Sequence, residues 1–308
     1  MRICELKKFC GIIPAFYACY DDHGEINVEG VKKLVRYFID KGVAGIYVNG
    51  SSGECIYQTV DERKKILETV MEEASGRIVV ISHVACNNIK DSMTLAKHAE
   101  SLGVDAIASI PPIYFRLPED SIAEYWNQIS SAAPNTDFII YNIPQLAGTT
   151  LTVPLFRKMR ENPRVIGVKN SSIPTQDIQI FKSEGGNDCV IFNGVDEQYI
   201  AGKVMGADGG IGGTYGVMPE LFLKMDNLLE QGNITDAKKI QYFVNRIIEK
   251  LCSGQGSMYA LIKEVLRVNE GIDIGDVRSP LPSMTKTDFK ISMEAADMIK
   301  EARELFIK

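Results

Sequence analysis

One lysine of this chain, Lys169, stands where the sequence could place a nucleophile. It directly follows the apolar run at residues 165–168, which is typical of a buried strand that ends at the lysine. A lysine is usually an exposed ammonium, because its charge is strongly hydrated and its ordinary pKa is about 10.4. Burial would destabilise that charge and favour a neutral amine, which can attack a ketone. The position of Lys169 therefore predicts imine chemistry.

Two tyrosines follow earlier strand-like runs in the same way. Tyr141 comes directly after the apolar residues 138–140. Tyr114 comes shortly after the preceding strand-like run, at residues 105–110. Because parallel strands of a barrel end at the same face, Tyr141 is expected beside Lys169. The two phenols could relay protons through Ser51, although tyrosines in such segments also serve as packing residues with a bonded hydroxyl.

A turn of glycine and serine at residues 50–53 follows another strand-like run. Its backbone N–H groups and the hydroxyls of Ser51 and Ser52 could hold a small carboxylate at the mouth of the helix predicted to begin near residue 61. Glycine and serine also make ordinary turns. The carboxylate interpretation therefore depends on the neighbouring lysine.

Two further segments lie at predicted strand ends. Asp196 and Glu197 follow the run at residues 189–194, where they could accept hydrogen bonds from sugar hydroxyls or cap the helix that begins there. Both interpretations stay open. The glycine-rich segment 209–213, which contains Ile211, lacks the G-K-[ST] ending and the G-x-G-x-x-G spacing, so it does not indicate nucleotide binding.

The elements that must carry these residues alternate along the chain. Helix-length stretches at residues 28–41, 61–74, 90–102 and 119–132 have apolar residues at the three- and four-residue spacing of a helix packed on one face. Strand-like runs lie between them, at residues 11–16, 44–49, 78–84, 105–110, 138–142, 165–169, 189–194 and 208–212. This pattern predicts an α/β fold, a (β/α)8 TIM barrel, in preference to a doubly wound open sheet.

Residues after about Gly232 change in character. Helices are predicted at residues 234–251, 258–269 and 287–307, with a break at residues 280–282. The chain is therefore divided into a catalytic barrel at residues 1–232 and a C-terminal helical extension at residues 233–308.

Composition excludes several classes of protein. The chain has 308 residues and a net charge of −6, which argues against nucleic-acid binding. Charged residues within positions 1–10 leave no apolar leader, and no later segment is long and apolar enough to span a membrane, so a cytoplasmic protein is expected. The seven cysteines and three histidines lack the spacing of a disulfide framework or a metal site, so no metal is predicted.

Four motifs occur in order: G-S-S-G-E at 50–54, Y-N-I-P at 141–144, G-V-K-N-S at 167–171 and G-G-I-G at 209–212. Together they are highly specific, and over essentially its full length the chain resembles the dihydrodipicolinate synthase/N-acetylneuraminate lyase family of class I aldolases. The resemblance implies a homotetrameric barrel that binds pyruvate, or the pyruvyl half of a longer acid, as a Schiff base on Lys169, without a metal or organic cofactor.

The same resemblance implies roles for individual residues. Ser51 and Ser52 match the two hydroxyl residues that hold the substrate carboxylate. Tyr141 matches the tyrosine that shuttles the proton during carbon–carbon cleavage, and Tyr114 matches a tyrosine that assists from a neighbouring subunit.

Within the family, one position separates two activities. In dihydrodipicolinate synthases the corresponding segment resembles Y-N-x-P-x-R-T-G, and its arginine binds the carboxylate of the second substrate. This chain has Leu146 at the position of that arginine. Sialic acid lyases are more similar, although Ser171 stands where they carry threonine and Gly213 where they carry a substrate-contacting serine. The residues predicted to bind substrate are Ser51, Ser52, Ser171, Gly194, Asp196, Glu197 and Ile211.

The leading prediction is reversible cleavage of N-acetylneuraminate to N-acetylmannosamine and pyruvate. An aldolase for another 2-keto-3-deoxy sugar acid and a dihydrodipicolinate synthase are the enzymatic alternatives. A catalytically silent barrel that senses carbohydrate is the non-enzymatic alternative. Lys169, Tyr141 and Ser51 argue against it, because a binding module needs no imine-forming amine.

Overall fold

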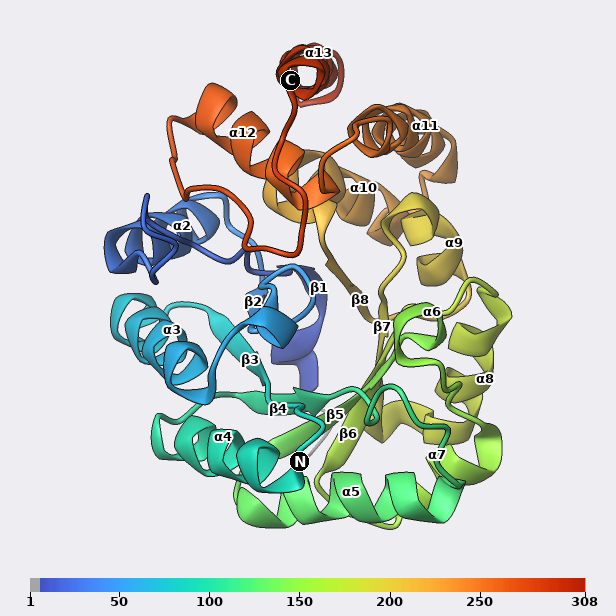
Figure 1. The fold of residues 1–308 in the computed structure, drawn as a ribbon. Coiled ribbons are helices and arrows are strands. Elements are labelled where there is room, and N and C mark those ends of the chain that lie inside the picture. The colour runs from blue at the N-terminus through green and yellow to red at the C-terminus, as the bar shows by residue number, and fades with distance from the viewer. Residues whose placement is uncertain (1–5, 308) are drawn as a thin grey trace.

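The computed structural model describes residues 6–307 as a ring of parallel strands inside a ring of helices (Figure 1). Residues 1–5 and 308 lie outside the described part. Arg2, Cys4 and Glu5 are among them, and these residues contributed to the expectations that the chain has no apolar leader and no disulfide framework. The strands are β1 (Gly11–Pro14), β2 (Gly45–Val48), β3 (Val79–His83), β4 (Ala106–Ser109), β5 (Asp137–Asn142), β6 (Val165–Asn170), β7 (Val190–Asn193) and β8 (Gly209–Gly212).

The eight strands of residues 6–307 close into a barrel. Seven neighbouring pairs run parallel in the order β1-β8-β7-β6-β5-β4-β3-β2. Backbone bonds then join β1 to β2, since Ala44 N donates to Ile12 O and Phe16 N to Tyr47 O, each at 2.9 Å. The predicted (β/α)8 barrel is therefore confirmed, and every strand lies within two residues of its predicted range.

Closure requires close approach of two backbones where β8 meets β1. Gly209 pairs with Gly11, and a Cβ on Gly209 would lie 2.4 Å from the Gly11 carbonyl oxygen. A side chain at that point would push the two strands apart, so the glycine is required by packing.

Each strand buries both of its faces, which explains why the strands read as continuous apolar runs. Side chains alternate between the two faces. Ile139 and Ile166, for example, belong to the cluster inside the barrel, whereas Ile140 and Val168 belong to the larger cluster between the barrel and its helices.

The helices surround the barrel, and several of them begin at a residue whose side chain caps the first turn. Thr59 starts one of them with a capping box, in which its side chain and that of Glu62 bond each other's backbone N–H. The helices are α2 (Val28–Asp40), α3 (Val60–Ala74), α4 (Ile89–Ser101), α5 (Glu119–Ala132), α6 (Pro144–Ala147), α7 (Val153–Arg160), α8 (Gln176–Gly185), α9 (Tyr199–Val204), α10 (Pro219–Glu230), α11 (Ile234–Cys252), α12 (Met258–Glu270) and α13 (Lys286–Phe306). Short 3-10 helices are η1 (Lys7–Phe9), η2 (Cys55–Tyr57), η3 (Gly186–Asp188), η4 (Asp196–Gln198) and η5 (Thr214–Gly216).

The predicted C-terminal helices are present as α11, α12 and α13, which lie together on one side of the barrel (Figure 1). Their apolar side chains, such as Leu261 and Ala295, join the same buried cluster as Ile12 of the barrel. The connector at residues 271–285, between α12 and α13, crosses toward the strands near β1 and β2 (Figure 1). The extension is thus packed directly against the part of the barrel that carries the candidate site.

Within residues 6–307, no helix combines the length and the apolar character that crossing a membrane demands.

Candidate active site

The predicted site residues gather around one pocket at the C-terminal ends of the strands. The pocket has a volume of about 240 Å³. The following residues line it: Ala15, Ser51, Ser52, Tyr141, Ile143, Gln145, Leu146, Lys169, Ser171, Gly194, Val195, Asp196, Glu197, Ile211, Gly213, Thr214, Ile248, Met258 and Tyr259. Of the residues predicted to act on or bind substrate, only Tyr114 is missing from this lining.

Lys169 points into the barrel from β6. It is paired in register with Tyr141 of β5, and its side chain faces inward because the preceding Val168 faces the helices. Its Nζ lies 4.0 Å from the ring centre of Tyr141 and 4.2 Å from that of Tyr47. Only 4% of Lys169 is exposed to solvent, so the amine lies between two aromatic rings with little access to water.

This burial changes the acid–base behaviour of Lys169. Loss of hydration lowers the pKa of its amine from 10.5 to about 7, while the negative charge of Asp196 acts in the opposite direction. The amine is therefore neutral in the folded protein above about pH 7, and its lone pair is available to a carbonyl carbon.

Tyr141 remains a protonated phenol at neutral pH. Burial raises its pKa to about 12, and the nearby hydroxyls of Ser51 and Ser171 partly offset that rise. Ser171 has room only because residue 194 is glycine, since a Cβ on Gly194 would lie 2.1 Å from Ser171 Oγ. The phenol can therefore exchange its proton with hydroxyls that line the same pocket.

Asp196 lines the pocket and does not cap a helix. Its carboxylate accepts hydrogen bonds from the backbone N–H and the hydroxyl of Thr214, at 2.7 and 2.6 Å, and burial raises its pKa to about 6. The capping interpretation is wrong for Asp196, because neither η4 nor α9 has a side-chain cap bond and the carboxylate bonds Thr214 instead. Glu197 lines the pocket next to it and is exposed.

Ser51 and Ser52 lie where they were predicted, but their relation to α3 differs from expectation. The helix η2 separates the Gly50–Gly53 turn from α3, whose first N–H groups are bonded by its own capping box at Thr59. The prediction that the serines stand at the mouth of α3 is therefore wrong. A carboxylate in this corner would meet the turn itself, where Ser52 Oγ donates to the hydroxyl of Tyr259 at 3.3 Å.

Tyr114 does not reach the pocket of its own chain. It lies in the segment between β4 and α5, is 88% exposed, and stacks edge to face on Phe115. Its backbone has a φ of +87°, which is unusual for a bulky residue and marks a segment held in a strained conformation. Within one chain, Tyr114 therefore does not reach Ser51 to relay protons, and its role from a neighbouring subunit stays a prediction.

Three residues that the sequence analysis did not select shape the pocket. Tyr47 covers Lys169, Thr214 orients Asp196, and Tyr259 meets Ser52. Tyr47 lies within a strand that reads as packing, and Tyr259 lies in the first turn of α12, far along the chain from the barrel motifs. Only the packing of α12 against the barrel mouth reveals its place.

Among residues 6–307, no three His, Cys, Asp or Glu side chains are grouped closely enough to hold a metal ion. The groups available for chemistry in the pocket are therefore an amine, phenols, aliphatic hydroxyls and carboxylates.

A neutral lysine amine facing a phenol at the C-terminal mouth of a (β/α)8 barrel defines a class of enzyme, the imine-forming lyases known as class I aldolases. Comparison with known proteins gives the family. A family model described as the dihydrodipicolinate synthetase family matches residues 8–301. The chain is also 62% identical to the N-acetylneuraminate lyase of Mediterraneibacter gnavus over 302 residues, which cover 98% of this chain and 96% of the relative. The chain belongs to the dihydrodipicolinate synthetase family.

Solved structures agree with that placement. A wild-type sialic acid aldolase from Ruminococcus gnavus is 62% identical, has a TM-score of 0.96, and matches 97% of this chain and 99% of its own. The same aldolase, solved as a catalytic lysine mutant, has a TM-score of 0.97 and matches 98% and 99% of the two chains. A Clostridium difficile protein in complex with mannosamine is 30% identical, with a TM-score of 0.89 and coverage of 94% and 98%.

The lowered pKa of Lys169 predicts the pH dependence of the enzyme. We expect kcat/KM for a keto acid to rise with pH through about 7 and then to level off, because the nucleophilic amine forms as the ammonium loses its proton. Asp196→Asn should move this midpoint to lower pH, since the carboxylate raises the pKa of Lys169. Steady-state rates measured across pH values check both statements.

Glu184→Gln provides the control for this profile, because Glu184 pairs with Arg157 at the surface, outside the pocket. Its midpoint should equal that of the wild type. A wild-type midpoint near 10, or a midpoint that Asp196→Asn leaves in place, would contradict the electrostatic description of the site.

Proposed function

We propose that this protein catalyses the reversible cleavage of N-acetylneuraminate to N-acetylmannosamine and pyruvate, with a Schiff base on Lys169 as the covalent intermediate. The observation that carries the proposal is the buried Lys169 amine, 4.0 Å from the ring centre of Tyr141, in a pocket lined by hydroxyls and carboxylates. The names of the 62% identical relatives support this substrate.

The first half of the reaction uses the serine hydroxyls that line the pocket. The substrate carboxylate binds Ser51 and Ser52, which places its ketone carbon beside the amine of Lys169. The amine adds to that carbon and water leaves, so that a protonated imine forms. This step needs no cofactor, because the imine itself accepts the electrons of the bond that breaks next.

The second half uses Tyr141. As the imine forms, the phenol of Tyr141 donates its proton to the hydroxide that leaves as water and becomes a phenolate. The phenolate then accepts the proton of the hydroxyl at C4, the bond between C3 and C4 breaks, and the electron pair of that bond passes to the imine to give an enamine. The sugar then leaves as an aldehyde. Protonation of the enamine at C3 and hydrolysis of the imine release pyruvate and restore Lys169. Ser51 and Ser171, whose hydroxyls lower the pKa of Tyr141, assist its proton exchange.

The carboxylates that line the pocket favour a sugar as part of the substrate. Asp196 and Glu197 offer oxygen acceptors for hydroxyl groups, and Leu146 stands where a synthase would place an arginine. Among the described residues that line the pocket, Lys169 is the only lysine or arginine. The carboxylate of a second substrate such as aspartate semialdehyde would therefore meet no counter-charge.

The hydroxyl of Tyr259 lies near position 213, at which sialic acid lyases carry a serine. A Cβ on Gly213 would lie 3.1 Å from Ser52 Oγ and 3.9 Å from the Tyr259 hydroxyl, so the tyrosine oxygen lies close to the space that a serine side chain would use. Burial raises the pKa of Tyr259 to about 12, so it is a neutral donor at physiological pH. The chain thus retains a hydroxyl at this corner despite Gly213.

The exposed Tyr114 is a reason to expect that copies of this chain assemble into an oligomer. Tyr114 and Phe115 project from their own subunit, and a second copy could receive them at its pocket. We therefore propose a homotetramer in which Tyr114 assists Tyr141 of a neighbouring subunit, and an enzyme that works in the cytoplasm. We also propose that the chain divides into a catalytic part at residues 1–232 and an extension at residues 233–308.

The mechanism predicts a trapped adduct. Borohydride added with pyruvate should inactivate the enzyme and leave one reduced adduct per chain on Lys169. Tyr141→Phe should still form this adduct while kcat for cleavage falls by about 10²–10⁴-fold, because the phenol moves a proton mainly in the transition state. Peptide mapping and steady-state kinetics give the two readouts. An adduct on another lysine, or a Tyr141→Phe variant altered only in KM, would refute the assigned roles.

The carboxylates that line the pocket allow the substrate preference to be predicted. Wild-type enzyme should cleave N-acetylneuraminate efficiently and condense pyruvate with aspartate semialdehyde poorly. Glu197→Ala should lower kcat/KM for N-acetylneuraminate by an amount worth about 1–3 kcal/mol, because sugar hydroxyls lose their acceptor, and should leave the pyruvate adduct intact. The exposed Glu161→Ala serves as the control. Efficient condensation by the wild type would favour the synthase alternative, and another 2-keto-3-deoxy acid cleaved faster would favour the other aldolase.

A further inference from the structure

A buried carboxylate lies directly behind the serine turn. Glu54 follows Ser51 and Ser52 after a single glycine, yet its side chain is fully buried and points away from the pocket's lining. Its backbone is left-handed, with a φ of +54°, and Glu54 N donates to Ser51 O at 3.0 Å. Glu54 is therefore joined to the serine turn by a backbone hydrogen bond as well as by the chain.

Both oxygens of Glu54 are held by the C-terminal extension. Lys263 Nζ of α12 donates to one oxygen at 2.8 Å, and the backbone N–H of Arg278, in the connector at residues 271–285, donates to the other at 2.8 Å. Lys263 also donates to Asp276 O at 2.7 Å, which ties the connector to α12. Lys263 lies one helical turn after Tyr259, so the same helix both holds Glu54 and contacts Ser52.

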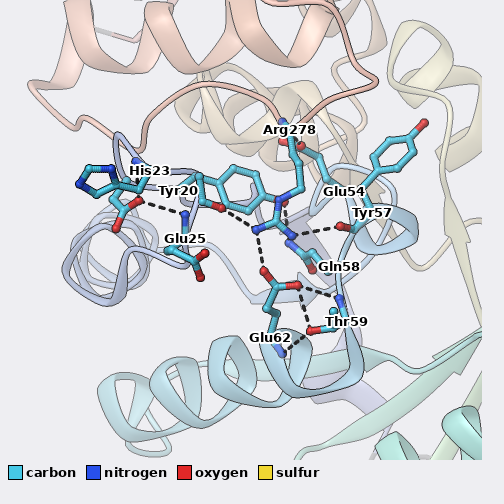
Figure 2. A network of polar contacts seen from close by, with 11 residues as sticks. Tyr20, His23, Glu25, Glu54, Tyr57, Gln58, Thr59, Glu62 and Arg278 are labelled. Atoms are coloured by element: carbon cyan, nitrogen blue, oxygen red, sulfur yellow. Dashed lines mark hydrogen bonds and ion pairs between the residues drawn. The ribbon is translucent and has the colours of Figure 1, made fainter.

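The side chain of Arg278 fixes the connector to the barrel (Figure 2). Its guanidinium donates to Glu62 of α3 at 2.6 Å and to the carbonyl oxygens of Tyr57 and Gly24 at 3.0 and 2.6 Å. Its Cζ lies over the ring of Tyr20, 4.4 Å from the ring centre. Figure 2 shows the guanidinium between the Tyr20 ring and the start of α3, so one side chain joins three separate segments of the barrel to the connector.

We propose that Glu54, Lys263 and Arg278 are positioning residues for the substrate carboxylate. Together they lock the Gly50–Gly53 turn against the C-terminal extension, and this contact sets where the hydroxyls of Ser51 and Ser52 stand. The inference rests on the proposed function, because it assigns the purpose of the contact to binding of the keto acid. It gives the extension a role in substrate binding in addition to its role in packing.

Kinetics separate a positioning role from a purely structural one. A poorly placed serine turn weakens binding of the carboxylate, which raises KM for pyruvate, whereas partial unfolding lowers the fraction of active enzyme and hence kcat. Arg278→Met should raise KM for pyruvate in the condensation direction roughly tenfold, with kcat within about threefold of wild type. Arg278→Lys, which keeps the charge but not the three-way bonding, should give an intermediate KM.

Arg267→Met is the matched control, since Arg267 of α12 pairs with Glu264 through two bonds and contributes to neither the pocket nor Glu54. Its KM should equal that of the wild type. If Arg278→Met does not fold, Glu62→Gln removes the negative charge that faces the guanidinium and should still raise KM for pyruvate. A folded Arg278→Met or Glu62→Gln enzyme with an unchanged KM for pyruvate overturns the positioning role. Absence of a Lys169 adduct in the wild type would instead overturn the proposed function.

Discussion

The free-energy cost of removing water from an ammonium ion is the constraint on which the site depends. The barrel interior removes water from Lys169 and covers the amine with the rings of Tyr47 and Tyr141, so the neutral form becomes accessible near pH 7. Asp196 limits this effect, because its charge favours the ammonium. Burial raises the pKa of Asp196 to about 6, so the carboxylate is still ionised where the amine becomes neutral. The barrel thus provides a nucleophile and an acceptor of hydrogen bonds at the same pH.

Strand geometry delivers the partners of this amine. The register of β5 and β6 pairs Tyr141 with Lys169, and the alternation of side chains turns both into the barrel. Glycines make the space for the remaining groups, since a Cβ on Gly194 would displace Ser171 and one on Gly212 would lie 2.2 Å from the Asp196 carboxylate. The C-terminal helices then complete the pocket through Tyr259 and hold the serine turn through Glu54.

Features that depend on local periodicity could be predicted from the sequence, and features that depend on contacts between distant segments could not. The strands, and the meeting of Tyr141 with Lys169, follow from apolar runs that end at one face of a barrel. The position of Tyr259 depends on how α12 packs, which apolar spacing does not determine. Asp196 bonds Thr214 because β7 and β8 are neighbours, and that contact cannot be distinguished from a helix cap by spacing alone.

The central claim is that folding converts Lys169 from an ordinary ammonium into an amine that is neutral near physiological pH. An NMR titration of protein carrying ¹³C at the lysine Cε position tests it most directly, with Lys169→Met used to assign the resonance. We predict that the Lys169 resonance titrates with a midpoint of about pH 7. A midpoint for Lys169 near its ordinary value of 10.5 would contradict it.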